Sequence, residues 1–510
     1  MKTLRLILGD QLNQNHSWYS TVDEEVLYCI FEMRQETDYV QHHIQKVIGF
    51  FAAMRAFSVH LQHQSHSVEY FTINDAKNQQ DLEQNIRLLV EQHDIEHFEY
   101  QAPDEFRLDE QLKSICGNIS ISSASYDTEH FLTTRDELAH FFEGKKQLLM
   151  ERFYRHMRKK HHILMEGEQP EGGTWNYDHN NRKKWKGQPE IPPYKAFKND
   201  VQEIREDIAN SGIKTIGNFK ESHFEYPINL VQAQQQLSYF CDALLPYFGD
   251  YQDALHTDEV YLFHSRLSFA MNLKIISPKE IILTVLEAYR KNMDRISIEQ
   301  TEGFIRQVIG WREYMRGMYW KEMPAYKSLN VLENHGHIPD FFWTGETKMN
   351  CLKKTIKNSL DHAYAHHIQR LMITGNYLLL TQTHPDAVDD WYLGIYIDAI
   401  EWVQLPNTRG MSQYADGGKI ATKPYVSSGS YINKMSNYCG SCQYNVKDRL
   451  GENACPFNSL YWNFLDDNKP KLFNNQRMRM MYSVLNKFSS EELYEMKLRA
   501  AEISSHPERF

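Results

Sequence analysis

The sequence predicts two parts of different fold class: an α/β N-terminal domain on a doubly wound parallel sheet, and a large all-α domain after it. Up to about residue 130, short apolar runs alternate with helical stretches, which is typical of a parallel sheet. From about residue 200 to the end, helical periodicity continues without a convincing set of strands. We therefore expect an α/β domain over residues 1–130, an interdomain linker over 131–199 and a helical domain over 200–510.

Four strands are expected in the N-terminal part, at residues 4–10, 25–33, 67–73 and 97–102. Ligands of such sheets bind beyond the carboxyl ends of the strands, which here points to Gly9, Asp10 and Glu32. No GxGxxG motif is present, so a nucleotide bound in the usual dinucleotide manner is not expected at this edge.

The second half is expected to be helical throughout. The helices are predicted near residues 200–210, 229–244, 277–291, 299–320, 351–374, 389–403 and 473–504. A chain of 510 residues with 41% hydrophobic content can bury the cores of two or three domains.

The charge balance limits any contact with nucleic acid to a local surface. With 56 Lys and Arg against 67 Asp and Glu, the formal charge is −11, which excludes a protein that coats nucleic acid with its whole surface. Residues 166–194 are predicted as a linker or long surface loop that carries Arg182 and Lys183 between Trp175 and Trp185. Basic residues interleaved with aromatic ones suit a nucleic-acid contact, and a solvated charge run is the alternative.

The N-terminus shows no targeting signal. Its short apolar run ends at Gly9-Asp10 with no small-residue cleavage pattern behind it. No stretch approaches the roughly 18 to 20 uninterrupted apolar residues that span a bilayer. We expect a cytoplasmic, monomeric protein that does not bind membranes.

Four of the seven cysteines form a pattern typical of metal ligation. Cys439-Gly-Ser-Cys442 is followed by Cys455, which a proline follows, and Cys351 lies upstream at the start of a predicted helix. Structural zinc sites usually join two CxxC motifs, or one CxxC and a histidine pair, and this region has one CxxC and no histidine. Three clustered thiolates and a distant fourth favour a [4Fe-4S] cluster, with zinc or unligated buried thiols as alternatives.

A histidine pair lies in the predicted helix at 351–374. In that helix His362, His366 and Arg370 would occupy successive i, i+4 positions and share one face. A histidine on a helix is usually a satisfied core or surface group, and His362 with His366 also has the spacing of a metal pair. The spacing by itself leaves these interpretations open.

Six motifs spread over nearly the whole chain resemble the photolyase and cryptochrome family. They are GDQL (9–12), HSRLS (264–268), WREYMRG (311–317), HHIQRLMITGN (366–376), the segment from WYLGIYIDAIEW to YADGG (391–418), and the CxxC region with its Cys-Pro. The likeness is closest to the prokaryotic iron-sulfur branch, whose members repair (6-4) photoproducts or act as blue-light receptors. It implies the photolyase/cryptochrome fold and a light-driven DNA photolyase of the (6-4) type, a lyase acting on UV-damaged DNA.

The resemblance also implies a folded, U-shaped FAD in the helical domain. The residues that it assigns to FAD are His264, Ser265, Leu267, Ser268, Arg370, Asp398, Gln404 and Asn407. The first four form a turn at a helix N-terminus, which suits a pyrophosphate, whereas Ser265 alone would be interpreted as a helix cap. Arg370 and Asp398 would form an ion pair against the flavin ring. Gln404 would face flavin N5, where many relatives have Asn, and His264 stands where many have Thr.

The same resemblance implies the catalytic residues. His366 would be the proton donor, with His367 assisting it and Tyr364 packing nearby. In (6-4) repair an excited reduced flavin gives an electron to the lesion, and an acid protonates the group that migrates between the two bases. The unperturbed pKa of histidine, near 6.5, would put both protonation states within reach. The lesion would have to be flipped out of the duplex.

Electron transfer and light harvesting are implied in the same way. Trp343, Trp391 and Tyr392 resemble the chain that reduces FAD from solvent, although plain core packing is the usual role of buried aromatics. The N-terminal domain would bind 6,7-dimethyl-8-ribityllumazine as the antenna. Its candidate contacts are Asp10, Glu32 and Lys46, with a solvated helix residue as the alternative for the lysine.

Three rival functions remain open on the sequence. They are a blue-light photoreceptor of the same fold, a nucleic-acid-binding protein with a structural cluster and no flavin, and repair of cyclobutane dimers. The pair His366-His367 and the basic loop favour (6-4) repair over the photoreceptor.

Overall fold

The computed structural model describes all 510 residues and starts with a five-stranded parallel sheet of order β3-β2-β1-β4-β5. The strands are β1 (Thr3–Leu6), β2 (Val26–Phe31), β3 (Ser67–Phe71), β4 (His97–Gln101) and β5 (Ser122–Tyr126). The chain winds outward in both directions from the central β1, so the predicted doubly wound α/β class is confirmed.

Strand β5 was not predicted from the sequence. Its residues, SSASY, are polar and mostly exposed, so no apolar run or alternation marks it. Backbone pairing with β4, with Phe98 opposite Ser123 and Tyr100 opposite Ser125, holds it at the sheet edge. An edge strand of this kind depends on its neighbour more than on its own side chains.

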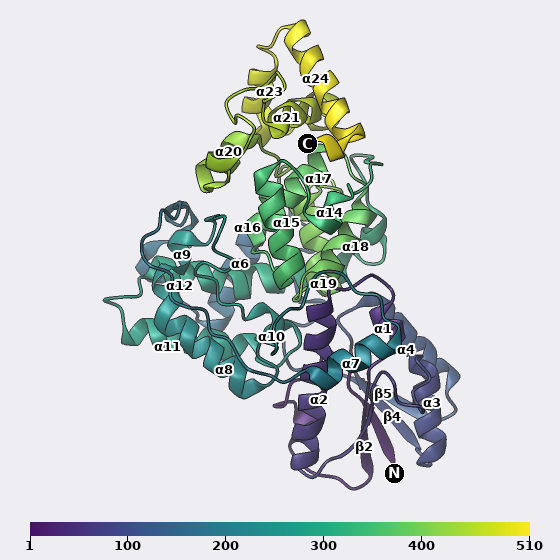
Figure 1. Cartoon of the computed structure of the whole chain (residues 1–510). Helices are drawn as coiled ribbons and strands as arrows, with labels where there is room; N and C mark the ends of the chain where they lie inside the picture. The colour runs from purple at the N-terminus through teal and green to yellow at the C-terminus, as the bar shows by residue number, and fades with distance from the viewer.

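Helices cover both faces of the sheet (Figure 1). The helices of this part are α1 (Arg34–Thr37), α2 (Ile44–His63), α3 (Leu82–Gln92), α4 (Phe106–Asn118) and α5 (Glu137–Phe141). Apolar residues of α3 and α4 pack on one face of the sheet, and those of α2 pack on the other. Helix α7 (Gln202–Ser211) also contacts α2, and Asp207 pairs with Arg55 at 2.6 Å. The chain just beyond residue 200 therefore covers the α/β part first.

The linker region contains α6 (Met150–His161), the hairpin β6 (Met165–Glu166) with β7 (Gln169–Pro170), and then only short 3-10 turns up to α7. The rest of the chain is helical, as predicted. Its first helices are α8 (Leu230–Tyr239), α9 (Leu245–Tyr251), α10 (Ser268–Asn272), α11 (Pro278–Lys291), α12 (Ile298–Ile305) and α13 (Glu313–Glu322). Those that follow are α14 (Phe341–Thr344), α15 (Asn350–His362), α16 (His367–Gln369), α17 (Asn376–Leu380), α18 (Pro385–Ile395) and α19 (Glu401–Leu405).

The C-terminal segment is drawn in yellow-green to yellow at one end of the molecule in Figure 1. Its helices are α20 (Gly429–Met435), α21 (Pro456–Asp467), α22 (Lys469–Leu472), α23 (Arg479–Leu485) and α24 (Ser490–Ser505). Helix α21 packs against both α24 and α17, which joins this segment to the rest. None of the helices combines the length and the apolar character that a bilayer crossing requires.

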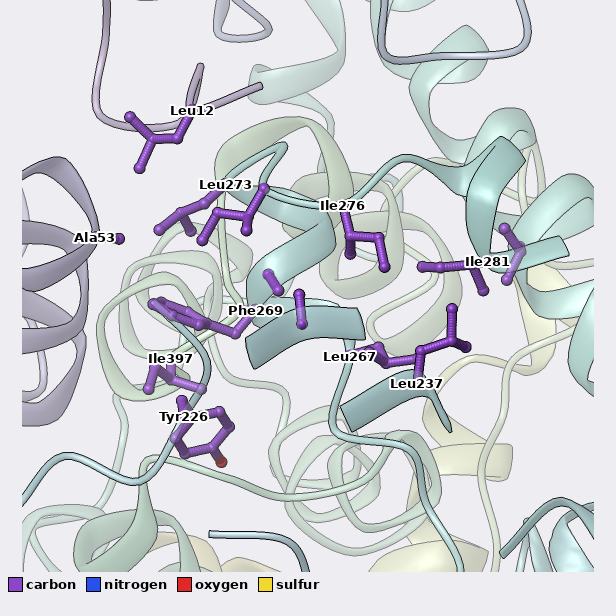
Figure 2. Close-up of a cluster of buried hydrophobic side chains, with 14 of the residues drawn as sticks. Leu12, Ala53, Tyr226, Leu237, Leu267, Phe269, Leu273, Ile276, Ile281 and Ile397 are labelled. Carbon is purple, nitrogen blue, oxygen red and sulfur yellow. The ribbon is translucent and has the colours of Figure 1, made fainter. Parts of the chain in front are cut away.

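The sheet and the helical part share one hydrophobic core. Figure 2 shows Leu12 and Ala53 of the α/β part in the same cluster as Phe269 and Leu273, which belong to α10 and the residue after it. The Leu12 N–H donates to the Leu273 carbonyl oxygen at 3.0 Å. A second core fills the space between α14–α18 and the C-terminal helices. Helix α10 therefore lies between the sheet and the other helices of the helical part.

Candidate functional site

The helix predicted over residues 351–374 is interrupted before the histidine pair. Helix α15 ends at His362, Ala363 has a left-handed backbone (φ 50°), and α16 begins only after His366. The Ala363 carbonyl, which would continue the helix, accepts instead from the Ile397 N–H at 2.9 Å. The prediction that His362, His366 and Arg370 share one helix face is therefore wrong. A hydrogen bond to a distant segment takes the place of the intrahelical hydrogen bond that a continuous helix would make at Ala363.

His366 is buried, with 4% of its surface exposed, and stacks on His264. The ring centroids are 4.7 Å apart and the planes differ by 19°. Neither ring nitrogen of His366 has a hydrogen-bond partner. Burial first, and then the neighbours His264, His367 and Arg370, hold the pKa of His366 well below its usual value. The expectation of a pKa near 6.5 is therefore wrong for the free protein, in which His366 is neutral, while His367 beside it is exposed.

The HSRLS segment forms a tight turn into α10. Arg266 has a left-handed backbone (φ 58°), the Leu267 N–H donates to Ser265 Oγ at 3.3 Å, and Ser268 is the first residue of the helix. Gln236 Nε2 donates to the Ser265 carbonyl oxygen at 2.8 Å. The first N–H groups of a helix have no partner inside the helix, so the turn offers donors to an anion.

Arg370 and Asp398 form the ion pair that the resemblance implied, with Nη2 and Oδ1 2.9 Å apart. Arg370 Nε also donates to the Ala365 carbonyl oxygen at 2.7 Å, and the guanidinium lies 3.8 Å from the centre of the Tyr396 ring. Burial opposes the charge, but Asp398 more than offsets it, so the Arg370 pKa is raised. Asn272 of α10 donates to the Asp398 carbonyl oxygen at 2.6 Å. Asn272 thus links Asp398 to α10, the helix that follows the HSRLS turn.

Three further candidates are Gln404, Asn407 and Tyr364. Gln404 is buried in α19. Asn407 Nδ2 donates to the Val403 carbonyl oxygen at 2.7 Å, so its amide is already used within its own helix. Tyr364 is buried and packs on Tyr261 with ring centroids 5.0 Å apart.

Three aromatic rings, of Phe342, Trp391 and Tyr392, lie in sequence and end beside Arg370. Trp343 is 43% exposed and follows Phe342, whose ring lies 5.1 Å from the fully buried Trp391. The Trp391 ring lies 5.3 Å from Tyr392, whose hydroxyl donates to the Arg370 carbonyl oxygen at 2.6 Å. Of the three residues predicted for electron transfer, Trp391 and Tyr392 are therefore brought together, whereas Trp343 is connected to them only as the chain neighbour of Phe342.

The four candidate cysteines line one cavity. Cys351 lies in the first turn of α15, Cys439 and Cys442 flank a short 3-10 turn, and Cys455 directly precedes α21. Burial raises the thiol pKa of Cys439 to about 11 and that of Cys455 to about 12. No three His, Cys, Asp or Glu side chains of the chain are close enough together to bind one metal ion. The thiols thus surround a space and do not converge on a point.

A larger cavity lies between the sheet and the helical part, and all three antenna candidates are in its lining. Asp10 pairs with Lys274 at 2.8 Å, and Lys46 Nζ donates to the Leu393 carbonyl oxygen at 2.8 Å. Burial lowers the Lys46 pKa to about 7, so the interpretation as a solvated helix residue is wrong. The Glu32 carboxylate accepts from Arg55, from the Tyr70 hydroxyl and from a backbone N–H, which leaves it little capacity for a ligand.

Comparisons with known proteins match this architecture over the whole chain. A family model described as deoxyribodipyrimidine photo-lyase-related protein matches residues 5–224. The (6-4) photolyase of Agrobacterium fabrum is 40% identical over 506 residues, which cover 98% of this chain and 99% of that protein. The chain belongs to the photolyase/cryptochrome family.

Solved structures of the photolyase/cryptochrome family have the same fold. A class III photolyase from Agrobacterium tumefaciens aligns with a TM-score of 0.55 and 14% identity, over 96% of this chain and 98% of that one. A cryptochrome from Synechocystis sp. PCC6803 aligns with a TM-score of 0.54 and 11% identity, over 97% and 93%. At this identity the two structures show the fold alone.

The basic loop is less available for DNA than its sequence indicated. Arg182 pairs with Asp178, and Lys183 pairs with Asp250 at 2.8 Å, although both cations remain exposed. Trp185 is buried against a histidine ring and cannot stack on a base. The predicted interleaving of basic and aromatic contacts is therefore wrong for Trp185, because the indole fills the core.

Several site residues of this photolyase/cryptochrome chain were not predicted. Glu105, Glu401 and Trp402 line the large cavity, and burial raises the Glu105 pKa to about 8. Gln369 and Tyr438 connect the histidine segment to the cysteine site. Gln369 in the HHIQR motif, Glu401 and Trp402 in the 391–418 motif, and Tyr438 next to Cys439 each had a local signal, whereas Glu105 had none.

Proposed function

We propose that this protein is a DNA photolyase that repairs (6-4) photoproducts of pyrimidines in UV-damaged DNA, driven by light. The observation that carries the proposal is the 40% identity to a (6-4) photolyase over 98% of the chain. A cryptochrome shares the fold, so the fold by itself does not separate repair from signalling. Identity to a repair enzyme along nearly the full length favours repair.

FAD is the cofactor that this reaction requires, and in its reduced form it supplies a light-excited electron. The turn around Ser265 and Ser268 offers N–H and hydroxyl donors suited to its phosphates. The partly buried ion pair of Arg370 and Asp398 keeps a positive charge where an electron-rich ring would be stabilised. Gln404 would add an amide beside that ring.

The proton chemistry falls to the stacked imidazoles. Because His366 is neutral in the free protein, it must gain its proton when DNA docks, and a nearby phosphate would raise its pKa. His264 and His366 together would hold one proton, since two positive charges in one stack repel each other. His367, whose side chain is exposed, would be available to contact the docked DNA. Arg182 and Lys183 would contact the phosphates outside the pocket.

Two further groups are part of the proposal. Four thiols around one cavity fit a [4Fe-4S] cluster, which takes four cysteine ligands. The large interdomain cavity suits an antenna chromophore such as 6,7-dimethyl-8-ribityllumazine, with Asp10 and Lys46 as its polar contacts. Trp343, Trp391 and Tyr392 would carry electrons inward to restore the reduced cofactor.

The test is light-dependent conversion of an oligonucleotide that carries one (6-4) photoproduct, followed by chromatography. Wild-type protein should remove the lesion only in the light. His366→Ala should lower the rate about 100-fold or more, the usual loss when a general acid is removed. His362→Ala is the matched control, since it lies outside the ring stack, and its rate should stay within about 3-fold of the wild type. Absence of light-driven loss of the lesion in the wild type would refute the proposal.

A further inference from the structure

Gln369 lies between His366 and the cysteine cavity and is hydrogen-bonded on both sides. Its Oε1 accepts from the His366 backbone N–H at 3.1 Å, and its Nε2 donates to the Tyr438 hydroxyl at 3.2 Å. Gln369 and Tyr438 are both buried, so water does not compete for either bond. An amide paired at both ends has a defined orientation.

Tyr438 is itself part of the cysteine site. It directly precedes Cys439 and lines the cavity that the four thiols surround. Its carbonyl oxygen accepts from Asn350 Nδ2 at 2.8 Å, and the same nitrogen donates to Ser441 Oγ at 3.1 Å. Asn350 precedes Cys351. Tyr438 is therefore held both by its neighbour Cys439 in the chain and by Asn350, the neighbour of Cys351.

On the other side, few contacts determine where the His366 ring lies. The residue follows the helix break at Ala363, and neither ring nitrogen has a partner. Its position depends on its backbone and on the stack with His264. The backbone N–H donates to Gln369 Oε1, and the carbonyl oxygen accepts from the Arg370 N–H at 3.2 Å. A shift of the Gln369 amide would therefore act on the ring through this N–H.

We propose that Gln369 is a positioning residue for the repair reaction: through Tyr438 it transmits the order of the four-cysteine site to the backbone of His366. This inference rests on the proposed function, because it takes His366 to act on a docked lesion and the thiols to bind a cluster. A group that holds Cys439 and Cys351 in place also holds the Tyr438 hydroxyl. The cysteine site would thus support the lesion pocket without taking part in its chemistry.

The test uses substitutions that remove single hydrogen bonds in the complete, cofactor-loaded protein. Tyr438→Phe removes the acceptor of the Gln369 amide and keeps the ring, and Gln369→Leu removes both bonds. Tyr377→Phe is the matched control: its buried hydroxyl has no hydrogen-bond partner, and its ring packs on Phe457, which lines the same cavity. Iron and FAD per chain, affinity for the lesion oligonucleotide, repair rate and the NMR signals of the His366 ring are measured, with His366→Ala assigning the signals.

Tyr438→Phe should keep iron, FAD and lesion affinity at wild-type levels, while the repair rate falls about 3- to 10-fold, the effect of one buried hydrogen bond on a transition state. The His366 ring signals should shift, because the ring current of His264 acts on them differently. Tyr377→Phe should change none of these. The double substitution at 369 and 438 should be no worse than Gln369→Leu alone, since Tyr438 acts only through its bond to Gln369, which Gln369→Leu already removes.

Unchanged ring signals and repair rate in Tyr438→Phe would overturn the proposal. A loss of iron in proportion to the loss of repair would also overturn it, because Tyr438 would then only hold the cluster. If the wild type repairs no (6-4) lesion, the proposed function fails. The His366 ring signals still test whether Tyr438 and Gln369 position His366. A shift in Tyr438→Phe but not in Tyr377→Phe supports the link, and no shift refutes it.

Discussion

At the scale of single residues, burial decides the charge that each site residue carries. His366 is neutral because it is buried beside His264 and Arg370, whereas Arg370 keeps its charge because Asp398 lies 2.9 Å away. A buried cation without its partner is costly, since the interior does not solvate it. The pair of Arg370 and Asp398 should therefore matter for stability and for cofactor retention.

We predict that Asp398→Asn lowers the free energy of unfolding by about 3 kcal/mol and reduces the FAD bound per chain, because Arg370 is left without a counter-charge. Asp386→Asn is the matched control, since Asp386 is exposed and its partner Arg409 keeps Asp389 at 2.6 Å. The control should cost less than about 1 kcal/mol. Denaturant unfolding and the flavin-to-protein absorbance ratio measure both, and equal effects of the two substitutions would contradict the assignment.

At the scale of elements, long helices are interrupted where the site is built. The π-helical turn Arg370–Gly375 packs against the π-helical turn Pro406–Ser412, and Gly375 lies at their closest approach. A Cβ at Gly375 would lie 2.2 Å from Ser412 Oγ and 2.6 Å from the Arg370 carbonyl oxygen. Only glycine permits this contact, since the carbonyl is backbone and cannot rotate away.

Gly375→Ala should therefore destabilise the protein by about 2 to 3 kcal/mol, through overpacking and through strain on the carbonyl that accepts from Tyr392. Gly117→Ala should have the opposite sign. Gly117 lies in α4 with nothing within 4 Å of the added Cβ, so alanine there should stabilise by about 0.5 to 1 kcal/mol. Thermal and denaturant unfolding of both variants check this, and a neutral Gly375→Ala would show that the two turns can separate.

At the scale of the whole molecule, α2 joins the sheet to the helical part (Figure 1). The His43 N–H at its N-terminus donates to the Gly394 carbonyl oxygen at 2.9 Å, and His43 Nε2 donates to the Leu360 carbonyl oxygen at 2.8 Å. His43 Nδ1 accepts from the Gln45 N–H at 3.1 Å. The ring can therefore make both hydrogen bonds only when it is neutral. Burial lowers its pKa to about 4.

The hydrogen bonds of the His43 ring should be lost in acid. The pKa of His43 is about 4 in the folded protein and about 6.5 when unfolded, so its contribution is fully present above pH 6.5 and is lost as the pH falls towards 4. We predict that the stability advantage of the wild type over His43→Asn shrinks by about 2 kcal/mol between pH 7 and pH 5. Denaturant unfolding of both proteins at the two pH values measures this, and a difference independent of pH would contradict it.

Much of this architecture could be read from local patterns. Apolar periodicity was enough to predict the α/β part, four of its five strands and the helical remainder, because those patterns reflect which face of an element is buried. The spacing of the cysteines and the motifs around Arg370 and Asp398 likewise predicted groups that lie together in the structure. Strand β5 was not predicted, because its pairing depends on a neighbouring strand and not on its own side chains.

Sequence alone therefore determined the fold class and the order of the elements, since these follow from periodicity along the chain, whereas most of the candidate site residues came from the motifs that resemble the family. Tertiary structure alone decided where the helix breaks before His366, that His264 lies against it, that Trp185 is buried and that Gln369 meets Tyr438. Each of these depends on segments far apart in the chain packing together and excluding water. Burial then sets the charges, and no local pattern specifies it.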